Sequence, residues 1–443
     1  MPNTPLLSHL GAPDNISAIP SAKRVFKLRS LHTVCQTPLS DTATVLIRKP
    51  RDTRRDSTRN MQKRVDHLIS IKAFTRQSLP TPIPSGTSFE SAVKALLEKW
   101  EDEQTGYLSV SSPILFNTLL ERSHQPGRLP LITQQPAAVK SFAYYPSSLG
   151  ILRIRDARGV LLGYRFKIPP HLLTTLNNSS QTLDSCGASA GSSGGRSVSA
   201  GLYESRHYTV SAADGKKYAE SQEFLRDGEN GREWLRENQE LFDYCSNQLR
   251  FLCPEQYVRM TGSVVKDMVK TQSADGSKLR PLGGAWHGVS LNQEIDSESG
   301  SRCHQDWLND KRLLNCVAPF GEGSQGGELV LWQMKMRIGL EIGDGFLFYG
   351  SLVAHEVTAG VRNSIDLFTH ASNYELLAKH EKAAGKGKKY PVKQKKPPAT
   401  KMKEEGRRVE ENAARRKKNR EGKKLRQLAA RNEIKREIKR EVS

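Results

Sequence analysis

Residues 304–370 decide the fold of this chain, and they read HQDWLNDKRLLNCVAPFGEGSQGGELVLWQMKMRIGLEIGDGFLFYGSLVAHEVTAGVRNSIDLFTH. The stretch consists of short apolar runs divided by Gly and Asp, a pattern that favours β-strands. With the segment just before it, the stretch predicts strands over residues 285–295, 313–320, 328–332, 336–342, 345–349, 353–357 and 362–369. Seven short strands at close spacing predict a sandwich or barrel rather than alternating β–α–β units.

Two histidines and one aspartate in this stretch have a spacing that suits a metal site. His304 and Asp306 stand two residues apart, so in an extended chain both side chains project to the same side. His355 follows near the end of the predicted sheet, at the start of a strand. Two imidazoles and one carboxylate form the facial triad that binds Fe(II) and leaves positions open for oxidant and co-substrate. An HxD triplet alone arises by chance in many proteins. The prediction rests instead on the ordered set of the HxD triplet followed by His355.

A basic and a hydroxyl side chain follow on the next predicted strand. Arg362 and Ser364 share one face of it by the period of two, and the short interval from His355 predicts a tight hairpin that Gly360 would allow. A guanidinium binds carboxylates through paired, charge-assisted hydrogen bonds, so this pair suits the distal carboxylate of 2-oxoglutarate. Asn292, on the strand that leads to the HxD motif, is a further candidate for contact with co-substrate or substrate. A purely structural role for Asn292 is the alternative.

Residues 304–370 resemble the core of the 2-oxoglutarate/Fe(II)-dependent dioxygenase superfamily, and in particular the TET/JBP-like oxygenases expanded in fungal genomes. The resemblance covers residues 285–370 well and the helical segment before them weakly. It implies an α+β fold with a double-stranded β-helix (jelly-roll) core and packed helices. It also implies that His304, Asp306 and His355 hold Fe(II), that Arg362 with Ser364 holds 2-oxoglutarate, and that O2 is the co-substrate in the oxidation of a C–H bond.

One part of the family pattern has no counterpart in this chain. The six cysteines are scattered, with no CxxC pair, and therefore predict free thiols rather than the Cys-rich zinc-binding region of animal TET enzymes. No separate DNA-reading domain is evident either. These two departures weaken the prediction that the chain oxidises a base more than they weaken the prediction of the fold.

The remainder of the chain divides by composition. Of its 443 residues only 36% are hydrophobic, which predicts one folded catalytic region with long solvated flanks. The predicted parts are a mostly disordered basic segment at 1–85, a helix and β-hairpin at 86–176, a Ser/Gly-rich loop at 177–201, a helical lead-in with the dioxygenase core at 202–378, and a basic, partly helical tail at 379–443. No run of eighteen apolar residues occurs, so we predict no membrane span.

Helical periodicity is clearest ahead of the predicted sheet. It predicts helices over residues 62–74, 88–103 and 216–252, with a β-hairpin over 149–168. Ser88 is the expected N-cap of the second helix. The glycines between residues 228 and 231 are expected to break the third helix into two.

Positive charge is concentrated at the C-terminal end of the sequence. The net charge is +21, and in residues 379–443 we count 25 Lys and Arg against 9 Glu, a net charge of +16. Such a tail suits contact with phosphate backbones, and its near lack of aromatics argues against base stacking by the tail itself. We therefore expect nucleic acid and nuclear proteins as partners, no membrane partner, and a nuclear or nucleolar location.

Three functions remain open at this point. The first is an oxygenase that acts on a modified nucleic-acid base, such as 5-methylcytosine or thymine. The second is a protein side-chain hydroxylase that acts on a nucleic-acid-associated protein. The third is a catalytically inactive nucleic-acid-binding scaffold, against which the complete metal triad argues.

Overall fold

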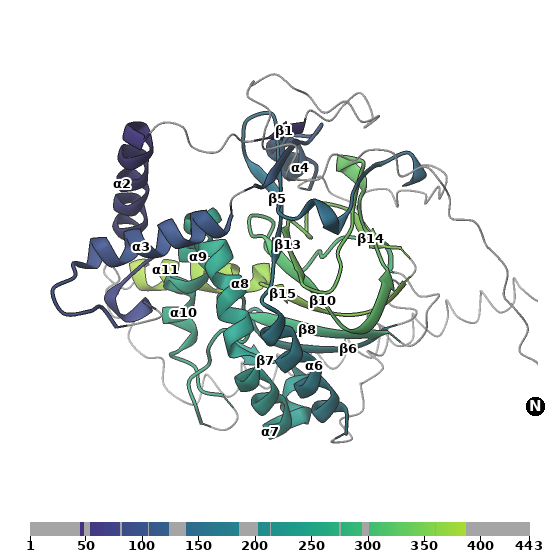
Figure 1. The fold of residues 1–443 in the computed structure, drawn as a ribbon. Helices are drawn as coiled ribbons and strands as arrows, with labels where there is room; N and C mark the ends of the chain where they lie inside the picture. Colours follow the sequence, from purple (N-terminus) through teal and green to yellow (C-terminus); the bar gives the residue numbers. More distant parts are fainter. Residues whose placement is uncertain are drawn as a thin grey trace, which may run out of the picture. The chain divides into compact units, whose positions relative to one another are not determined.

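The computed structural model describes residues 45–47, 54–79, 82–104, 106–123, 139–185, 203–212, 214–273, 276–294, 301–358 and 360–386. The chain divides into two compact units, Met1–His380 and Glu381–Ser443, and the site discussed below belongs to the first. Helices and two β-sheets make up the described part, which confirms the α+β class (Figure 1). Within the segment 1–85, predicted to be mostly disordered, the structure describes the helix α2 (Arg54–Ser70), whose Met61, Val65 and Leu68 are buried in a small core. Residues 1–44 and the helix predicted in the tail lie outside the described residues.

The larger sheet has ten strands. In spatial order they are β1 (Val45–Ile47), β2 (Leu108–Ser111), β4 (Leu152–Arg155), β5 (Leu161–Lys167), β13 (Asp344–Phe348), β10 (Asn315–Gly326), β15 (Gly360–Phe368), β8 (Gly288–Glu294), β6 (Tyr203–Ser211) and β7 (Ala219–Glu220). The predicted hairpin is confirmed as β4 and β5, which pair antiparallel.

The smaller sheet has five strands. Their order is β3 (Ala143–Tyr145), β12 (Met336–Ile338), β11 (Leu329–Leu331), β14 (His355–Val357) and β9 (Ser301–His304). Each of the seven strands predicted between residues 285 and 369 is present. From β8 to β15 the chain passes repeatedly between the two sheets, so residues from both sheets meet in the space between them.

The tight hairpin predicted between His355 and Arg362 is wrong. β14 pairs with β11 and β9 in the smaller sheet, whereas β15 pairs with β10 and β8 in the larger one. Thr358 still belongs to the smaller sheet, because its N–H donates to the carbonyl of Glu328 at 3.0 Å. The chain therefore crosses between the sheets just before β15, and the short interval reflects a crossing rather than a turn.

Helices cover the face of the larger sheet that lies away from the smaller sheet (Figure 1). They are α6 (Pro170–Ser185), α7 (Gln222–Glu237) and α8 (Gln239–Leu252). Their apolar side chains, among them Leu176, Trp234 and Phe242, join one core with the outward-facing residues of the sheet. The helices thus pack on one face of the larger sheet, and its other face, toward the smaller sheet, can line a site.

The Ser/Gly-rich loop predicted for 177–201 differs from the structure at its start, because α6 (Pro170–Ser185) continues through it. Leu176 is fully buried against the core, and the Ser180 hydroxyl accepts a hydrogen bond at 3.1 Å from a buried tryptophan of α7. Packing and buried hydrogen bonds thus stabilise a helix whose Asn, Ser and Thr content favours a loop. Residues 186–202 lie outside the described range.

The predicted helices are otherwise present with shifted ends. α3 (Phe89–Glu103) is capped by Ser88, whose side chain accepts a hydrogen bond from the backbone N–H of Ser91. The expected break in the third helix is confirmed at Gly228, which has a φ of +54° inside α7. A second boundary follows at Asn238, after which α8 begins.

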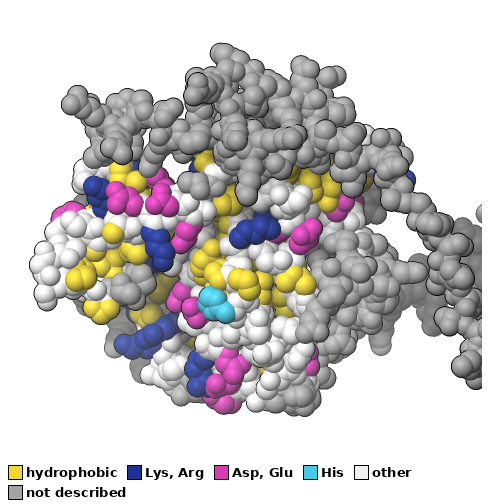
Figure 2. All heavy atoms as spheres, in the orientation of Figure 1, with side chains coloured by type: hydrophobic (Ala, Val, Ile, Leu, Met, Phe, Trp, Pro, Cys, Tyr) yellow, Lys and Arg dark blue, Asp and Glu magenta, His cyan; other side chains and the backbone are white. Residues whose placement is uncertain are grey.

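The remaining helices complete the frame. They are α2 (Arg54–Ser70), α4 (Phe116–Ser123), α9 (Pro254–Thr261), α10 (Ser263–Met268) and α11 (Ala371–Lys386). None of the described helices is long and apolar enough to cross a membrane. Figure 2 shows one face of the molecule, on which apolar side chains lie in patches between basic and acidic ones.

Candidate metal centre

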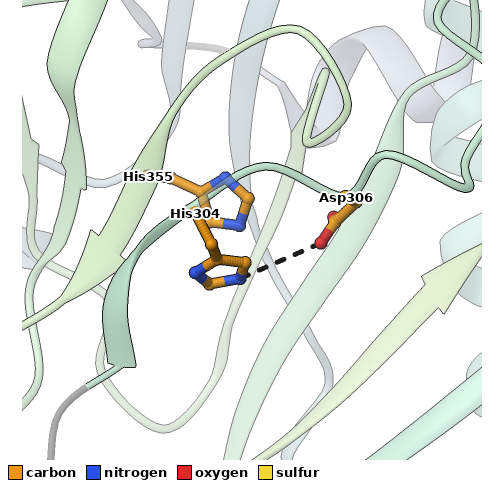
Figure 3. A group of neighbouring side chains, drawn as sticks. All are labelled: His304, Asp306 and His355. Atoms are coloured by element: carbon orange, nitrogen blue, oxygen red, sulfur yellow. Dashed lines mark ion pairs between the residues drawn. The ribbon is translucent and has the colours of Figure 1, made fainter. Parts of the chain in front are cut away.

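His304, Asp306 and His355 come together between the two sheets (Figure 3). One ligand atom from each lies within 4.8 Å of those of the other two. His304 ends β9 and His355 begins β14, and the two residues are partners in the antiparallel pairing of these strands. Their ring centres are 4.3 Å apart, and Nε2 of His304 lies 3.9 Å from Oδ1 of Asp306. The strand register thus creates the histidine pair, and the next two residues of the chain add the carboxylate.

The His355 ring is held in the form that a metal needs. Its Nδ1 lies 2.9 Å from the carbonyl oxygen of Val353, and a carbonyl only accepts, so Nδ1 carries the proton. Nε2 therefore keeps its lone pair. Burial, and then the neighbouring His304, lower the pKa of His355 well below its ordinary value. The ring of Phe348 packs edge-on against it at 4.9 Å. His355 is thus a neutral imidazole with a fixed orientation.

Residues of the larger sheet orient the Asp306 carboxylate. Nδ2 of Asn315, at the start of β10, donates to Oδ2 of Asp306 at 2.8 Å. The backbone N–H of Asp306 donates to the carbonyl of Gly350 at 3.0 Å. One carboxylate oxygen is thereby occupied, while the other lies toward His304. Partners of this kind fix the direction in which a carboxylate binds a metal.

Position 350 has no room for a side chain. A Cβ on Gly350 would lie 2.7 Å from Nδ2 of Asn315 and still closer to Oδ2 of Asp306. Both the carboxylate and the amide would have to move. Glycine is therefore required here because of the close approach of Asp306, not because of its backbone angle.

Gln305, between the two ligands of the HxD motif, fixes the loop to the segment that precedes His355. Its side chain is buried, and Nε2 donates to the carbonyl of Leu352 at 2.7 Å. On the same segment, the N–H of Ala354 donates to Oε1 of Gln333 at 2.8 Å. The first bond links the HxD loop to the segment before His355, and the second links that segment to the short 3-10 helix Trp332–Met334.

The larger sheet turns one side toward this centre, and we call it the metal face. Asn315 and Phe348 are cross-strand partners on β10 and β13, and they contact Asp306 and His355. By strand register and the period of two, Ser364, Asp366 and Asn292 lie on the same side.

Asn292 and Ser364, two of the predicted site residues, are direct partners across β8 and β15. Oδ1 of Asn292 accepts from the hydroxyls of Ser205 at 2.7 Å and Ser290 at 2.8 Å. Its Nδ2 donates to Asp366 at 2.7 Å and to Ser364 at 3.4 Å. These hydrogen bonds form a network of polar side chains on the metal face. Contact of Asn292 with a co-substrate stays a prediction.

Arg362 lies on β15, two residues before Ser364, as predicted. Its side chain is outside the described part of the structure, so its contact with 2-oxoglutarate also stays a prediction. The sequence-based reasoning did not identify Asn315, Gly350 or Gln305 as part of the site. Of these three residues only Gln305 could have been found from the sequence, because it lies inside the HxD motif. Asn315 and Gly350 come close to Asp306 only in the folded chain.

The donor set fits a divalent transition metal. Two neutral or neutralisable imidazoles and one carboxylate on one side of an ion match the facial triad of non-haem iron. In the part of the chain that the structure describes, this is the group of His, Cys, Asp and Glu side chains close enough together to hold an ion. The four described cysteines are free thiols and do not belong to it.

Comparison with known proteins gives matches among solved structures only. No protein-family model matches the sequence, and no curated protein matches it. The chain is similar to a structure of NgTET1 in complex with 5mC DNA, with a TM-score of 0.37 and 13% identity, over 61% of this chain and 100% of that one.

Two further structures are similar over smaller parts. A prolyl-4-hydroxylase from Pseudomonas putida gives a TM-score of 0.26 and 13% identity, over 47% of this chain and 91% of that one. An oxidoreductase of the 2OG-Fe(II) oxygenase family from Burkholderia pseudomallei gives 0.17 and 20% identity, over 19% of this chain and 41% of that one. All three TM-scores are below 0.5, so the proposal below rests on the chain's own residues.

Proposed function

We propose that this chain is a 2-oxoglutarate- and Fe(II)-dependent oxygenase with a double-stranded β-helix core. The convergence of His304, Asp306 and His355 on one point between two sheets is the observation that supports it. The eight strands β8 to β15, which pass back and forth between the sheets, support the jelly-roll part of the proposal.

In this proposal His304, Asp306 and His355 would hold the iron, and Arg362 with Ser364 would hold the distal carboxylate of 2-oxoglutarate. When bound, Fe(II) supplies the oxidation chemistry, in which O2 and 2-oxoglutarate convert a substrate C–H to C–OH with release of succinate and CO2. The chain supplies orientation. Val353 fixes the His355 tautomer, and Asn315 fixes the carboxylate of Asp306.

As substrate we propose a modified nucleic-acid base, such as 5-methylcytosine or thymine. The support is electrostatic, because a net charge of +21, mostly in residues 379–443, attracts polyanions. The same charge supports nucleic acid and nuclear proteins as partners and a nuclear or nucleolar location.

The enzyme class is tested by 2-oxoglutarate turnover without substrate. Purified protein with Fe(II), ascorbate and O2 should convert 2-oxoglutarate to succinate, and Asp306→Ala should abolish this. Asp102→Ala, at an exposed site on α3, is the matched control and should keep wild-type turnover. Absence of both turnover and Fe(II) binding in the wild-type protein would contradict the proposed class.

The substrate class is tested separately. Methylated DNA and RNA are incubated with protein, Fe(II) and 2-oxoglutarate, and their nucleosides are analysed by mass spectrometry. A gain of one oxygen atom on a pyrimidine supports the nucleic-acid substrate. The same gain only on histone or ribosomal peptides would instead establish a protein hydroxylase.

A further inference from the structure

Two large apolar side chains are exposed directly beside the metal centre. Trp307 is 44% exposed and Leu308 is 67% exposed, and they follow Asp306 in the chain. Four other large apolar side chains of the described residues are exposed, at 37–40%, and Trp307 and Leu308 are the pair that adjoins in sequence. Single exposed apolar residues are common, whereas a contiguous pair next to a reaction centre indicates a contact surface.

The exposure of Trp307 and Leu308 is imposed by an anchored backbone. Before them, the N–H of Asp306 donates to Gly350, and after them the N–H of Asn309 returns to the carbonyl of Asp306 at 2.9 Å. The carbonyl of Leu308 accepts from the N–H of Ala371 at 2.9 Å. Because Asn309 is itself buried, the loop is fixed on both sides and holds the two side chains outward.

A row of rings leads from the metal face to this loop. Asn309 pairs with His370, which places the loop beside the end of β15. The ring of His370 lies 5.1 Å from that of Phe368, which lies 6.3 Å from that of His207. Phe368 extends over Gly288, where a Cβ would come within 2.8 Å of the ring. Planar groups therefore line the metal face at the end where Trp307 stands.

The same loop carries positive charge. Lys311 and Arg312 follow within five residues of Trp307. Arg312 is exposed, whereas Lys311 is half-buried and its Nζ donates to the carbonyl of Ser123 at 2.5 Å. Two acids lie in the same loop. Asp306 belongs to the metal centre, and Asp310 is buried and paired with Arg259 at 3.0 Å, so Asp310 offsets little of this charge. An aromatic ring with adjacent cations suits a base and its phosphate, and a basic or neutral peptide would not gain from the cations.

We propose that Trp307 is a stacking platform for one base of a single-stranded or flipped-out nucleotide, with Arg312 meeting its phosphates and Lys311 adding positive charge nearby. The base would then lie next to the centre formed by Asp306 and its neighbours, as chemistry on a base requires. That the bound base is then oxidised rests on the proposed function. The contact between Trp307 and a base requires neither iron nor turnover.

Tryptophan fluorescence of the full, metal-free chain tests the platform. A short single-stranded oligonucleotide should quench the fluorescence, while an abasic strand of equal length, which keeps the phosphates, should not. The base-containing strand should bind about tenfold more tightly than the abasic strand, as expected for one stacked base. Trp307→Phe should lose the quenching but keep most of this preference, and Trp307→Ala should lose both.

The control is Leu225→Ala, an equally apolar exposed site on α7, on the far side of the larger sheet, and it should behave as wild type. Quenching that survives in Trp307→Phe, or a preference for bases that survives in Trp307→Ala, would overturn the proposal. Quenching by a peptide but not by the oligonucleotide would overturn it in favour of a peptide substrate. Succinate formation, measured on the same preparations, reports separately on the oxygenase class.

Discussion

Nδ2 of Asn315 lies 2.8 Å from Oδ2 of Asp306, so a residue of the larger sheet orients a carboxylate that follows a strand of the smaller one. We predict that Asn315→Ala leaves the fold intact but weakens metal binding about 10- to 100-fold, because the freed carboxylate samples other directions. Titration with Fe(II) or Co(II) measures the affinity. Asn178→Ala, an exposed site on α6, should have no effect, and equal affinities in all three proteins would contradict the prediction.

Gly350→Ala should be more damaging to the metal site than Asn315→Ala. The new methyl group would occupy the space of the Asp306 carboxylate and the Asn315 amide, so both must move. We expect metal binding below detection in the same titration. The melting temperature should also fall, because an added methyl group in a packed site costs about 1–3 kcal/mol. Ser351→Ala, at the adjacent buried position, should keep the metal. A Gly350→Ala protein that binds metal normally would show that the loop can relax.

The buried ring of His287 leads us to predict that the folded protein loses stability in acid. Nε2 of this ring donates to the carbonyl of Met260 at 3.0 Å, and Nδ1 accepts from Asn373 at 2.8 Å. Burial lowers the pKa of His287 from 6.5 to about 4. As the pH falls, His287 is therefore protonated in the unfolded chain before it is protonated in the folded protein. The contribution of His287 to the free energy of unfolding is complete above pH 6.5 and is lost as the pH falls toward 4. The loss at pH 4 is about 3 kcal/mol.

Urea unfolding of the wild type and of His287→Gln, followed between pH 7 and pH 4, measures this effect. Carboxylates titrate in both proteins, so the comparison isolates the histidine. The variant should show the smaller decrease in unfolding free energy over this range. Parallel curves for the two proteins would mean that His287 is not the group responsible.

Arg362→Lys should raise the KM for 2-oxoglutarate with a smaller effect on kcat. Lysine keeps the charge but cannot form the paired hydrogen bonds that a guanidinium makes with a carboxylate. The loss of one charge-assisted bond corresponds to about 10- to 100-fold in KM. Succinate formation against 2-oxoglutarate concentration gives both constants. Arg158→Lys, on an exposed turn, is the control, and an unchanged KM in Arg362→Lys would assign the carboxylate to another residue.

Much of the core could be predicted from local pattern. The strands β8 and β10 to β15 follow apolar runs that Gly and Asp interrupt, and α3 follows a run with helical spacing and a serine cap. Short-range physics determines these strands and this helix, so one sequence is enough to find them. The HxD motif and His355 stand fifty-one residues apart, and they could be grouped in prediction only by their order, their metal-binding residue types and the resemblance to a known family.

Other features depend on contacts distant in sequence. α6 contains a polar stretch that reads as a loop, and its helix is stabilised by burial of Leu176 and by hydrogen bonds to Ser179 and Ser180. The crossing after His355 looks like a turn until both partner strands are known. Asn315 and Gly350 reach Asp306 only in the folded chain, so no local pattern marks them.

The position of the metal centre between the sheets has a consequence for how the protein unfolds. His304 and His355 belong to the smaller sheet, whereas Asp306 is held by Asn315 of the larger one. A bound ion would therefore clamp the two layers, and opening them would require its release. By mass action, metal that binds only the closed form raises the melting temperature in proportion to the logarithm of its free concentration. Thermal shift can thus rank candidate ions and site variants before any substrate is known.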